Sequence, residues 1–173
     1  MMTITHSGTD IWRVITELAI IGYLIYLSIY DIRYHKIRNN AVLLFIPIVM
    51  MKCTLRVCMG TLNVPGTLFA YVPMLLGAAA GFVILLSAAM ITHGGIGGGD
   101  IKLAGVLGLA AGFYEIVAAL ILGLVAASIA ALIQSYIYKT RHIYTPLAPF
   151  LSAGFAASLI LFRFLPEIEI LLR

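Results

Sequence analysis

Residues 94–103, GGIGGGDIKL, separate two long apolar stretches of the chain. Five of the first six residues are glycine, and they are followed by Asp100 and, two places on, by Lys102. Glycine permits unusual backbone angles, a sharp turn and close approach of another backbone, so we expect such angles before Asp100. An aspartate at the centre of a membrane helix costs roughly 2.5–3.5 kcal/mol, so an acid beside such apolar stretches is a candidate functional residue. The same pattern also fits an ordinary helix start with Asp100 as its N-cap.

The composition indicates a membrane protein. Of 173 residues, 62% are hydrophobic and 10% are charged, and the mean hydropathy is +1.08. A soluble domain is about 45–50% apolar and about 25% charged. The net charge of +4 comes from scattered basic residues, which favours contact with anionic lipid and not with nucleic acid. We predict an all-α integral membrane protein, with residues 1–173 forming a single domain.

Hydropathy predicts a bundle of about six transmembrane helices, because a span needs about 20 mostly apolar residues. Lipid offers no partner to an open strand edge, so the spans must be helices. Small residues four positions apart, Gly77 with Gly81 and Gly108 with Gly112, predict close helix packing. The expected spans are residues 11–30, 41–57, 66–91, 101–113, 116–138 and 147–165.

The span count places two acids at the same membrane face. Two predicted spans separate Asp31 from Asp100, and two is an even number. Both acids are followed two places on by a base, Arg33 and Lys102, and they are the only acids expected on that face. The positive-inside rule makes this face cytoplasmic, by six basic residues against five: Arg33, Lys36, Arg38, Lys102, Lys139 and Arg141 against Arg13, Lys52, Arg56, Arg163 and Arg173.

Two carboxyl groups that meet in such a bundle would share a proton, because both cannot ionise easily when they are close. One could then activate a water while the other donates to a carbonyl oxygen, as in aspartic proteases. No metal site is expected, because Cys53 and Cys58 match no zinc pair and the histidines form no HExxH motif. The two cysteines could form a disulfide in an oxidising compartment, but we expect free thiols near a membrane interface. The glycine stretch fits neither a P-loop nor a dinucleotide motif in its spacing.

Three segments resemble the type IV prepilin peptidases, a family of membrane aspartic proteases. Gly97, Gly99 and Asp100 match the GxGD signature, with Lys102 after it. Asp31 begins DIRYHKIRN, which is similar to the family's basic loop and ends at Asn39, although Arg38 replaces the usual proline. A third segment resembles the Pro-x-x-Pro-Phe start of the family's last span: Pro146, Pro149 and Phe150.

The resemblance implies an endopeptidase that cuts the short leader from type IV prepilins or prepilin-like proteins at the cytoplasmic face of the cell membrane. Asp31 and Asp100 would be the catalytic pair, with no metal and no cofactor. Many relatives also carry a cysteine-rich insert and methylate the new amino terminus. Only about thirty residues precede Asp31 here, nearly all of them needed for one span, so we expect no methyltransferase activity. The expected supporting residues are Gly97, Gly99, Lys102, Arg33 and Asn39.

Two other classes of protein fit parts of the pattern. Two intramembrane acids can couple a cation or proton in a small transporter, but no inverted repeat is visible and no acid lies inside the other spans. A structural membrane subunit leaves the three segments unexplained. Incubation with prepilin peptides separates the three classes, since only the peptidase produces one cut at the leader border.

Overall fold

The computed structural model describes residues 5–34, 39–58, 69–92, 95–138 and 146–164 of the chain. All regular secondary structure in these ranges is helical, which confirms the predicted all-α class. The elements are α1 (Thr5–Tyr34), α2 (Asn39–Cys58), the 3-10 helix η1 (Phe69–Tyr71), α3 (Val72–Ile91), α4 (Gly98–Ala111), α5 (Phe113–Tyr138) and α6 (Ala148–Phe164).

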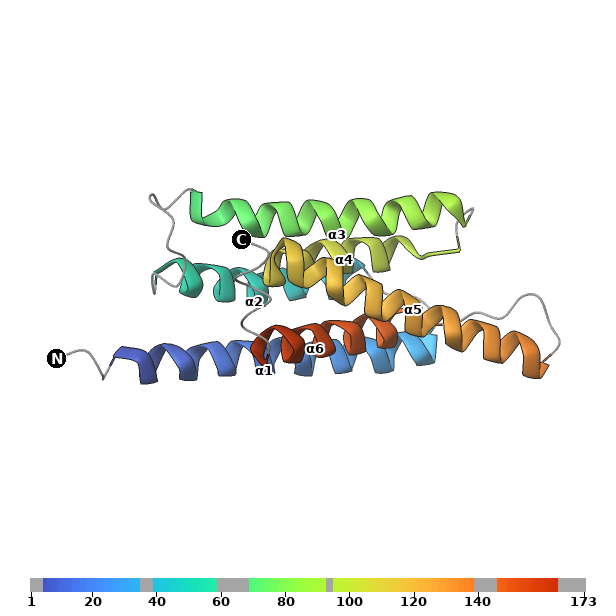
Figure 1. Ribbon diagram of the computed structural model, residues 1–173, viewed down its shortest axis with the longest axis horizontal. Helices are drawn as coiled ribbons and strands as arrows, with labels where there is room; N and C mark the ends of the chain where they lie inside the picture. The colour runs from blue at the N-terminus through green and yellow to red at the C-terminus, as the bar shows by residue number, and fades with distance from the viewer. Residues whose placement is uncertain (1–4, 35–38, 59–68, 93–94, 139–145, 165–173) are drawn as a thin grey trace.

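The helices form an elongated bundle in which α3 lies along one side and α1 and α6 lie along the other (Figure 1). Between them, α4 packs against α3 and also contacts α2 and α5. α5 runs obliquely across the bundle from α4 to α6 and extends beyond the other helices (Figure 1). The beginning of α4 and the end of α1 therefore lie toward the same end of the bundle (Figure 1).

The prediction of six full spans is corrected by the helix lengths. Three of the described helices are long and apolar enough to cross a membrane, over Ile11–Tyr34, Val72–Ile91 and Phe113–Ile137. The apolar stretches of α2 and α6 are shorter, Asn39–Leu55 and Ala148–Phe162. α4 has 14 residues and so rises about 21 Å, less than the roughly 30 Å of a hydrocarbon core.

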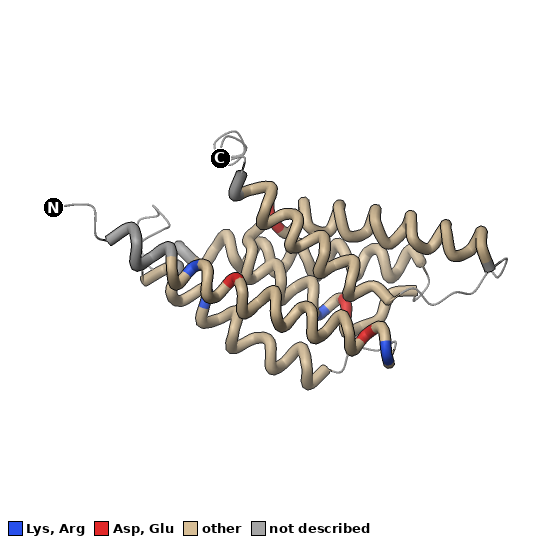
Figure 2. Tube along the Cα trace, turned by 90° about the horizontal axis from the view of Figure 1, so that it is seen from below, with Lys and Arg blue, Asp and Glu red and all other residues tan. Residues whose placement is uncertain are grey.

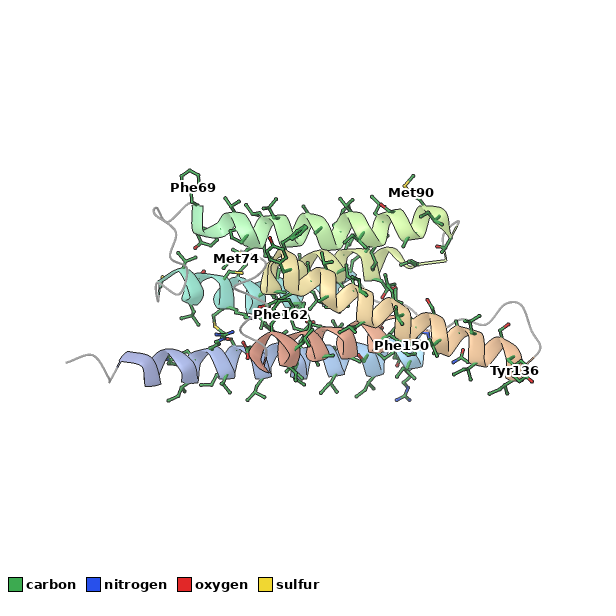
Figure 3. The ribbon with its side chains drawn as sticks, in the orientation of Figure 1. Phe69, Met74, Met90, Tyr136, Phe150 and Phe162 are labelled. Atoms are coloured by element: carbon green, nitrogen blue, oxygen red, sulfur yellow. The ribbon has the colours of Figure 1, made fainter. Side chains whose placement is uncertain are left out.

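The outer surface of the bundle is apolar, as expected of a lipid-facing protein. Phe69 and Met90 point away from the two ends of α3, and Tyr136 points outward near the end of α5 (Figure 3). Met74, by contrast, points from α3 into the interior and is 2% exposed. Charged positions are few along the described helices (Figure 2). Large apolar side chains on the surface are stable in contact with lipid, whereas their contact with water is unfavourable.

The α3–α4 contact is close because glycines face each other across it. A Cβ atom added at Gly108 would meet the carbonyl oxygen of Gly77 and lie 2.9 Å from the backbone nitrogen of Ala78. A Cβ atom added at Gly81 would meet the carbonyl oxygen of Ala104. Backbone atoms cannot move aside as a flexible side chain can, so the predicted role of these small residues in helix packing is confirmed.

Gly112 sets the direction of α5. It follows the last residue of α4 and has a φ of 98°, a conformation that glycine adopts without a steric penalty. Its N–H donates to the carbonyl oxygen of Gly108 (2.8 Å), and its own carbonyl accepts from the N–H of Ile116 (3.1 Å). One residue thus both ends α4 and begins α5.

We predict that Gly108→Ala destabilises the bundle, by about 1–3 kcal/mol or more, since the new methyl group meets the α3 backbone. Gly22→Ala is the matched control, because nothing lies within 4 Å of a Cβ atom there and alanine is the better helix former by about 1 kcal/mol. Thermal unfolding of both variants in detergent measures the difference. Equal losses of stability in the two variants would contradict close packing at Gly108.

Candidate active site

Asp31 continues the buried stripe of α1. Ile20, Leu24, Leu27 and Asp31 recur at helical spacing, and each is at most 4% exposed. The predicted span ended at residue 30, which placed Asp31 just after the helix. The helix instead continues to Tyr34, so Asp31 lies inside its last turn. The carboxylate oxygen Oδ2 accepts a hydrogen bond from the backbone N–H of Ala148 at 3.1 Å. Residues 35–38 of the basic loop, with His35, Lys36, Ile37 and Arg38, lie outside the described residues.

The partner of Asp31 is the first residue of α6. The carbonyl oxygen of Leu147 accepts from the N–H groups of Phe150 (3.1 Å) and Leu151 (3.0 Å), and Pro149 has no N–H. The N–H of Ala148 therefore has no acceptor within its own helix, and Asp31 supplies one. Negative charge is also favoured at a helix N-terminus by the helix dipole.

A second polar contact joins α1 to α6 one turn below. The hydroxyl of Ser28 donates to that of Ser152 at 2.8 Å, and the hydroxyl of Ser152 donates to the carbonyl oxygen of Ala148 at 2.7 Å. Ser28 lies three residues before Asp31 and so on the same face of α1. The start of α6 is therefore attached to α1 by both backbone and side-chain hydrogen bonds.

Asp100 lies in the first turn of α4. The helix begins at Gly98 with Gly97 as its N-cap, so the alternative of Asp100 as N-cap is wrong. The N–H of Asp100 donates to the carbonyl oxygen of Gly97 at 3.0 Å, and the Asp100 carboxyl group accepts a hydrogen bond from the Gly97 backbone. This exchange resembles a capping box, in which an acid at the third helical position returns to the N-cap N–H.

The Asp100 carboxyl group is buried although it lies at a helix start. The residue is 8% exposed, and its Oδ1 is buried with no hydrogen-bond partner among the described residues. On the same face of α4, Leu103, Ala104 and Leu107 are buried in the core. Asp100 thus occupies the end of an apolar stripe, as Asp31 does on α1.

Gly97 leaves room for this carboxyl group. Its φ of −68° and ψ of 142° are open to any residue, so the expected need for unusual backbone angles is not met at this position. A Cβ atom at Gly97 would lie 3.1 Å from Oδ2 of Asp100, whereas one at Gly98 would meet nothing within 4 Å. Gly99 lies inside α4, and Gly112 has the positive φ among the described glycines.

The two carboxyl groups interact electrostatically. Asp100 lies outside the three long spans, one residue before the apolar stretch of α4. The pKa of Asp100 is raised to about 7, first by burial and then by the charge of Asp31, while the Gly97 hydrogen bond acts in the opposite direction. The structure therefore brings together the two acids that the span count had placed on one face.

The predicted supporting residues differ in their positions. Lys102 is exposed and its Nζ donates to Oδ1 of Asn39 at 3.0 Å, which ties the second turn of α4 to the first residue of α2. Arg33 is exposed and has no hydrogen bond or ion pair with the described residues. Arg13 and Glu17 form an ion pair within α1. The bases after the two acids thus form no salt bridge with them in the described part of the chain.

Both cysteines are free thiols, as expected. Cys53 is buried and its thiol lies 3.4 Å from the carbonyl oxygen of Leu109, whereas Cys58 is exposed. No group of three or more His, Cys, Asp or Glu residues that could hold a metal ion occurs in the searched, described residues.

Sequence reasoning missed the Ala148 amide and the Ser28–Ser152 pair. A backbone N–H leaves no mark of its own in a sequence. The usable signal was proline near a helix start, at Pro146 and Pro149, which indicates that the first N–H groups of that helix need acceptors from elsewhere. In the sequence, Ser28 and Ser152 are single small residues within apolar spans, and nothing in the pattern indicates that they pair.

A groove lies between α1 and α2, on the face of α1 next to the one that carries Asp31. Its volume is about 490 Å³, and it is lined by Tyr23, Tyr26, Tyr30, Asn40, Ala41 and Leu44. The Tyr23 hydroxyl donates to the carbonyl oxygen of Ala41 at 2.6 Å, and its ring stacks on that of Phe45 with centroids 4.9 Å apart. Tyrosines of this kind are common at membrane interfaces.

The fold and site define a helical membrane protein with a buried pair of carboxyl groups at one end. Residues 18–134, a range that contains both acids, match the type IV leader peptidase family, and the chain belongs to that family. The chain is 33% identical over 137 residues to the prepilin leader peptidase/N-methyltransferase of Bacillus subtilis (strain 168), which covers 78% of this chain and 50% of that protein. The chain thus spans about half the length of this curated relative. No solved structure matches the chain.

We predict that stability falls as the pH rises and that Asp100→Asn reduces this fall. The pKa of Asp100 is about 7 in the folded protein against 3.8 as its ordinary value. The unfolded chain therefore ionises first, and stability is lost as the pH rises from about 4 to about 7. At about 1.4 kcal/mol per pH unit, the loss is on the order of a few kcal/mol. Thermal unfolding in detergent at about pH 5 and about pH 8 measures it, and parallel pH dependence in wild type and variant would contradict it.

Proposed function

We propose that this protein is a membrane-embedded aspartic endopeptidase that removes the leader of type IV prepilins or prepilin-like proteins. One observation carries the proposal: two carboxyl groups, 4% and 8% exposed, interact at one end of an apolar helical bundle. Burial of an ionisable group in a membrane protein costs free energy, and groups buried in this way are typical of functional sites. Membership of the type IV leader peptidase family supports the same reaction class.

The chemistry follows from the pairing. Two nearby carboxyl groups hold one proton between them at neutral pH. The ionised member takes a proton from water as the water attacks the scissile carbonyl, and the protonated member donates to the carbonyl oxygen. This pair needs no covalent intermediate, and water is the second substrate. A peptide must be extended when it reaches the acids. The acids lie at the end of the helical bundle, where an extended peptide has easier access than in the middle of the bundle.

The substrate is inferred to be a prepilin-type chain with a short leader ahead of an apolar helix. The name of the Bacillus subtilis relative includes prepilin leader peptidase, which supports this substrate class. Lys102 and Asn39 belong to the same end of the bundle, where their hydrogen bond connects the beginning of α4 to the beginning of α2. We infer that this end is cytoplasmic and that the protein resides in the cell membrane, from the distribution of basic residues.

The remaining inferences concern the supporting residues and methyl transfer. We infer that Gly97 and Gly99 set the backbone path that leads to Asp100. We also infer that Arg33 faces the substrate, because it is exposed in the same last turn of α1 as the buried Asp31. Peptidase activity without N-methyltransferase activity stays a prediction.

We predict that Asp31→Asn and Asp100→Asn each lower cleavage of a prepilin peptide by at least about a hundredfold, the lower range for loss of an acid–base group. The double variant falls scarcely further, because the pair acts as a unit. The measurement is mass spectrometry of the peptide after incubation with each purified protein in detergent. Glu17→Gln on α1, an acid that pairs with the exposed Arg13, is the control and keeps its activity. Substantial cleavage by either single Asn variant would exclude the assignment.

We predict that Gly97→Ala lowers the turnover number more than Gly98→Ala does. The added methyl group at position 97 would stand 3.1 Å from Oδ2 of Asp100 and displace the carboxyl group by a few tenths of an ångström, whereas position 98 is open. Such misplacement of a reacting group can cost up to about a hundredfold. The same peptide assay with a melting curve for each variant checks this. Equal activity of the two variants would show that Gly97 does not position Asp100.

A further inference from the structure

The two acids of the site have different surroundings. Oδ2 of Asp31 accepts the N–H of Ala148 at the start of α6, where the helix dipole adds to the stabilisation of negative charge. A hydrogen bond of this kind, from a backbone N–H to a carboxylate, is stronger than one between neutral groups. The hydrogen bond and the helix dipole both favour the charged form of Asp31, and they offset its burial at 4% exposure.

Asp100 is held differently. Its carboxyl group accepts a hydrogen bond from the Gly97 backbone. Oδ1, however, is buried and has no hydrogen-bond partner among the described residues. A buried charge that is left unpaired is far more costly than a buried neutral group. A protonated Oδ1 removes that charge and provides a hydroxyl donor for a substrate.

No other charged group near Asp100 in the described part of the chain reverses this difference. α3 carries no ionisable residue, and the Lys102 ammonium group on α4 is exposed and bonded to Asn39. On α2, Lys52 and Arg56 lie in the second half of the helix, remote in sequence from the Asn39 end. Glu115 belongs to the first turn of α5, beyond the opposite end of α4. Asp31 is the charge that acts on Asp100.

We propose that the carboxyl groups have fixed and unequal roles: Asp31 is the ionised member, held as a carboxylate by the first turn of α6, and Asp100 keeps the proton on its buried Oδ1. The Ala148 amide is then a positioning group for the base. This assignment rests on the proposed function for its chemical meaning, but the protonation states themselves can be measured without any substrate.

The roles give a balanced reaction. The Asp31 carboxylate takes one proton from water, the water oxygen bonds to the scissile carbonyl carbon, and the carbonyl oxygen takes the proton of Asp100. The resulting diol collapses as the C–N bond breaks: the nitrogen receives the proton from Asp31, and one hydroxyl returns its proton to Asp100. Both acids end in their starting states, and no other reactant is consumed.

Infrared difference spectroscopy of the purified full chain tests the assignment through the C=O stretching band of a protonated carboxyl group. At about pH 6 the wild type is expected to show this band, and it disappears as the pH rises through about 7, the pKa of Asp100. Asp100→Asn loses the band. Asp31→Asn keeps it, with its titration moved to lower pH because the neighbouring charge is gone. Glu17→Gln, which removes an acid paired with the exposed Arg13 on α1, is the control and leaves the band unchanged.

Three results would overturn the assignment: a wild-type band that is absent, a band that survives Asp100→Asn but not Asp31→Asn, or a band lost in both. The last result would mean that the proton belongs to the pair. In the Asp31→Asn variant the new amide side chain still offers an oxygen to the Ala148 N–H, so loss of that contact does not confuse the comparison. Failure of the peptide assay with the expected infrared result would reject the proposed function and leave the protonation states standing.

A second variant tests the positioning role of α6. Ala148→Pro removes the N–H donor at a helical position that proline tolerates, and Ala148→Gly keeps the donor and is the control. We expect Ala148→Pro to lower kcat with less change in KM and to move the acidic limb of the kcat profile to higher pH. A smaller amount of folded protein with an unmoved limb would overturn the positioning role. Ala148 is fully buried, so if the proline variant does not fold, the infrared comparison still decides the roles.

Discussion

Burial of two carboxyl groups at one end of an apolar bundle is the constraint on which the rest of the structure depends. Each acid takes a position that a core leucine would otherwise fill, at the end of a buried stripe on α1 or α4. Desolvation of both groups is tolerated only if one finds a donor and the other stays neutral. The start of α6 supplies the donor to Asp31, and the turn at Gly97 encloses Asp100. The stability of the fold and the chemistry of the site are therefore set by the same contacts.

Hydropathy predicted the helices well because lipid imposes one simple rule on spanning segments. In the described residues each expected span corresponds to one α-helix, in the same order, and the bounds differ by a few residues at most ends. Hydropathy could not separate a full span from a shorter helix packed among its neighbours. α4 is enclosed by α2, α3 and α5, so its apolar residues serve protein contacts, and 14 residues are enough for that purpose. Composition shows that a segment is apolar but does not show whether its side chains contact lipid or other helices.

The glycines illustrate a second limit. From the sequence, glycines before Asp100 indicated unusual backbone angles. The structure shows ordinary angles at Gly97 and a lack of room for a side chain beside Oδ2 of Asp100. Gly112 has the positive φ, although nothing in its local sequence distinguishes it from Gly108, which is required for close approach to α3. A glycine has one property, the missing Cβ atom, and tertiary contacts decide which consequence of it matters.

The pairing of the acids was predictable from an even number of spans, but their inequality was not. Span counting places side chains at a face and says nothing of the hydrogen bonds they receive. That difference arises from Ala148, more than a hundred residues away from Asp31 in sequence, through a backbone group that every non-proline residue carries. Pro149, the next residue, has no N–H, and the first residue of α6 gives its own N–H to Asp31. The segment that resembles a family motif thus contributes one backbone donor at the start of α6, and Asp31 accepts from it.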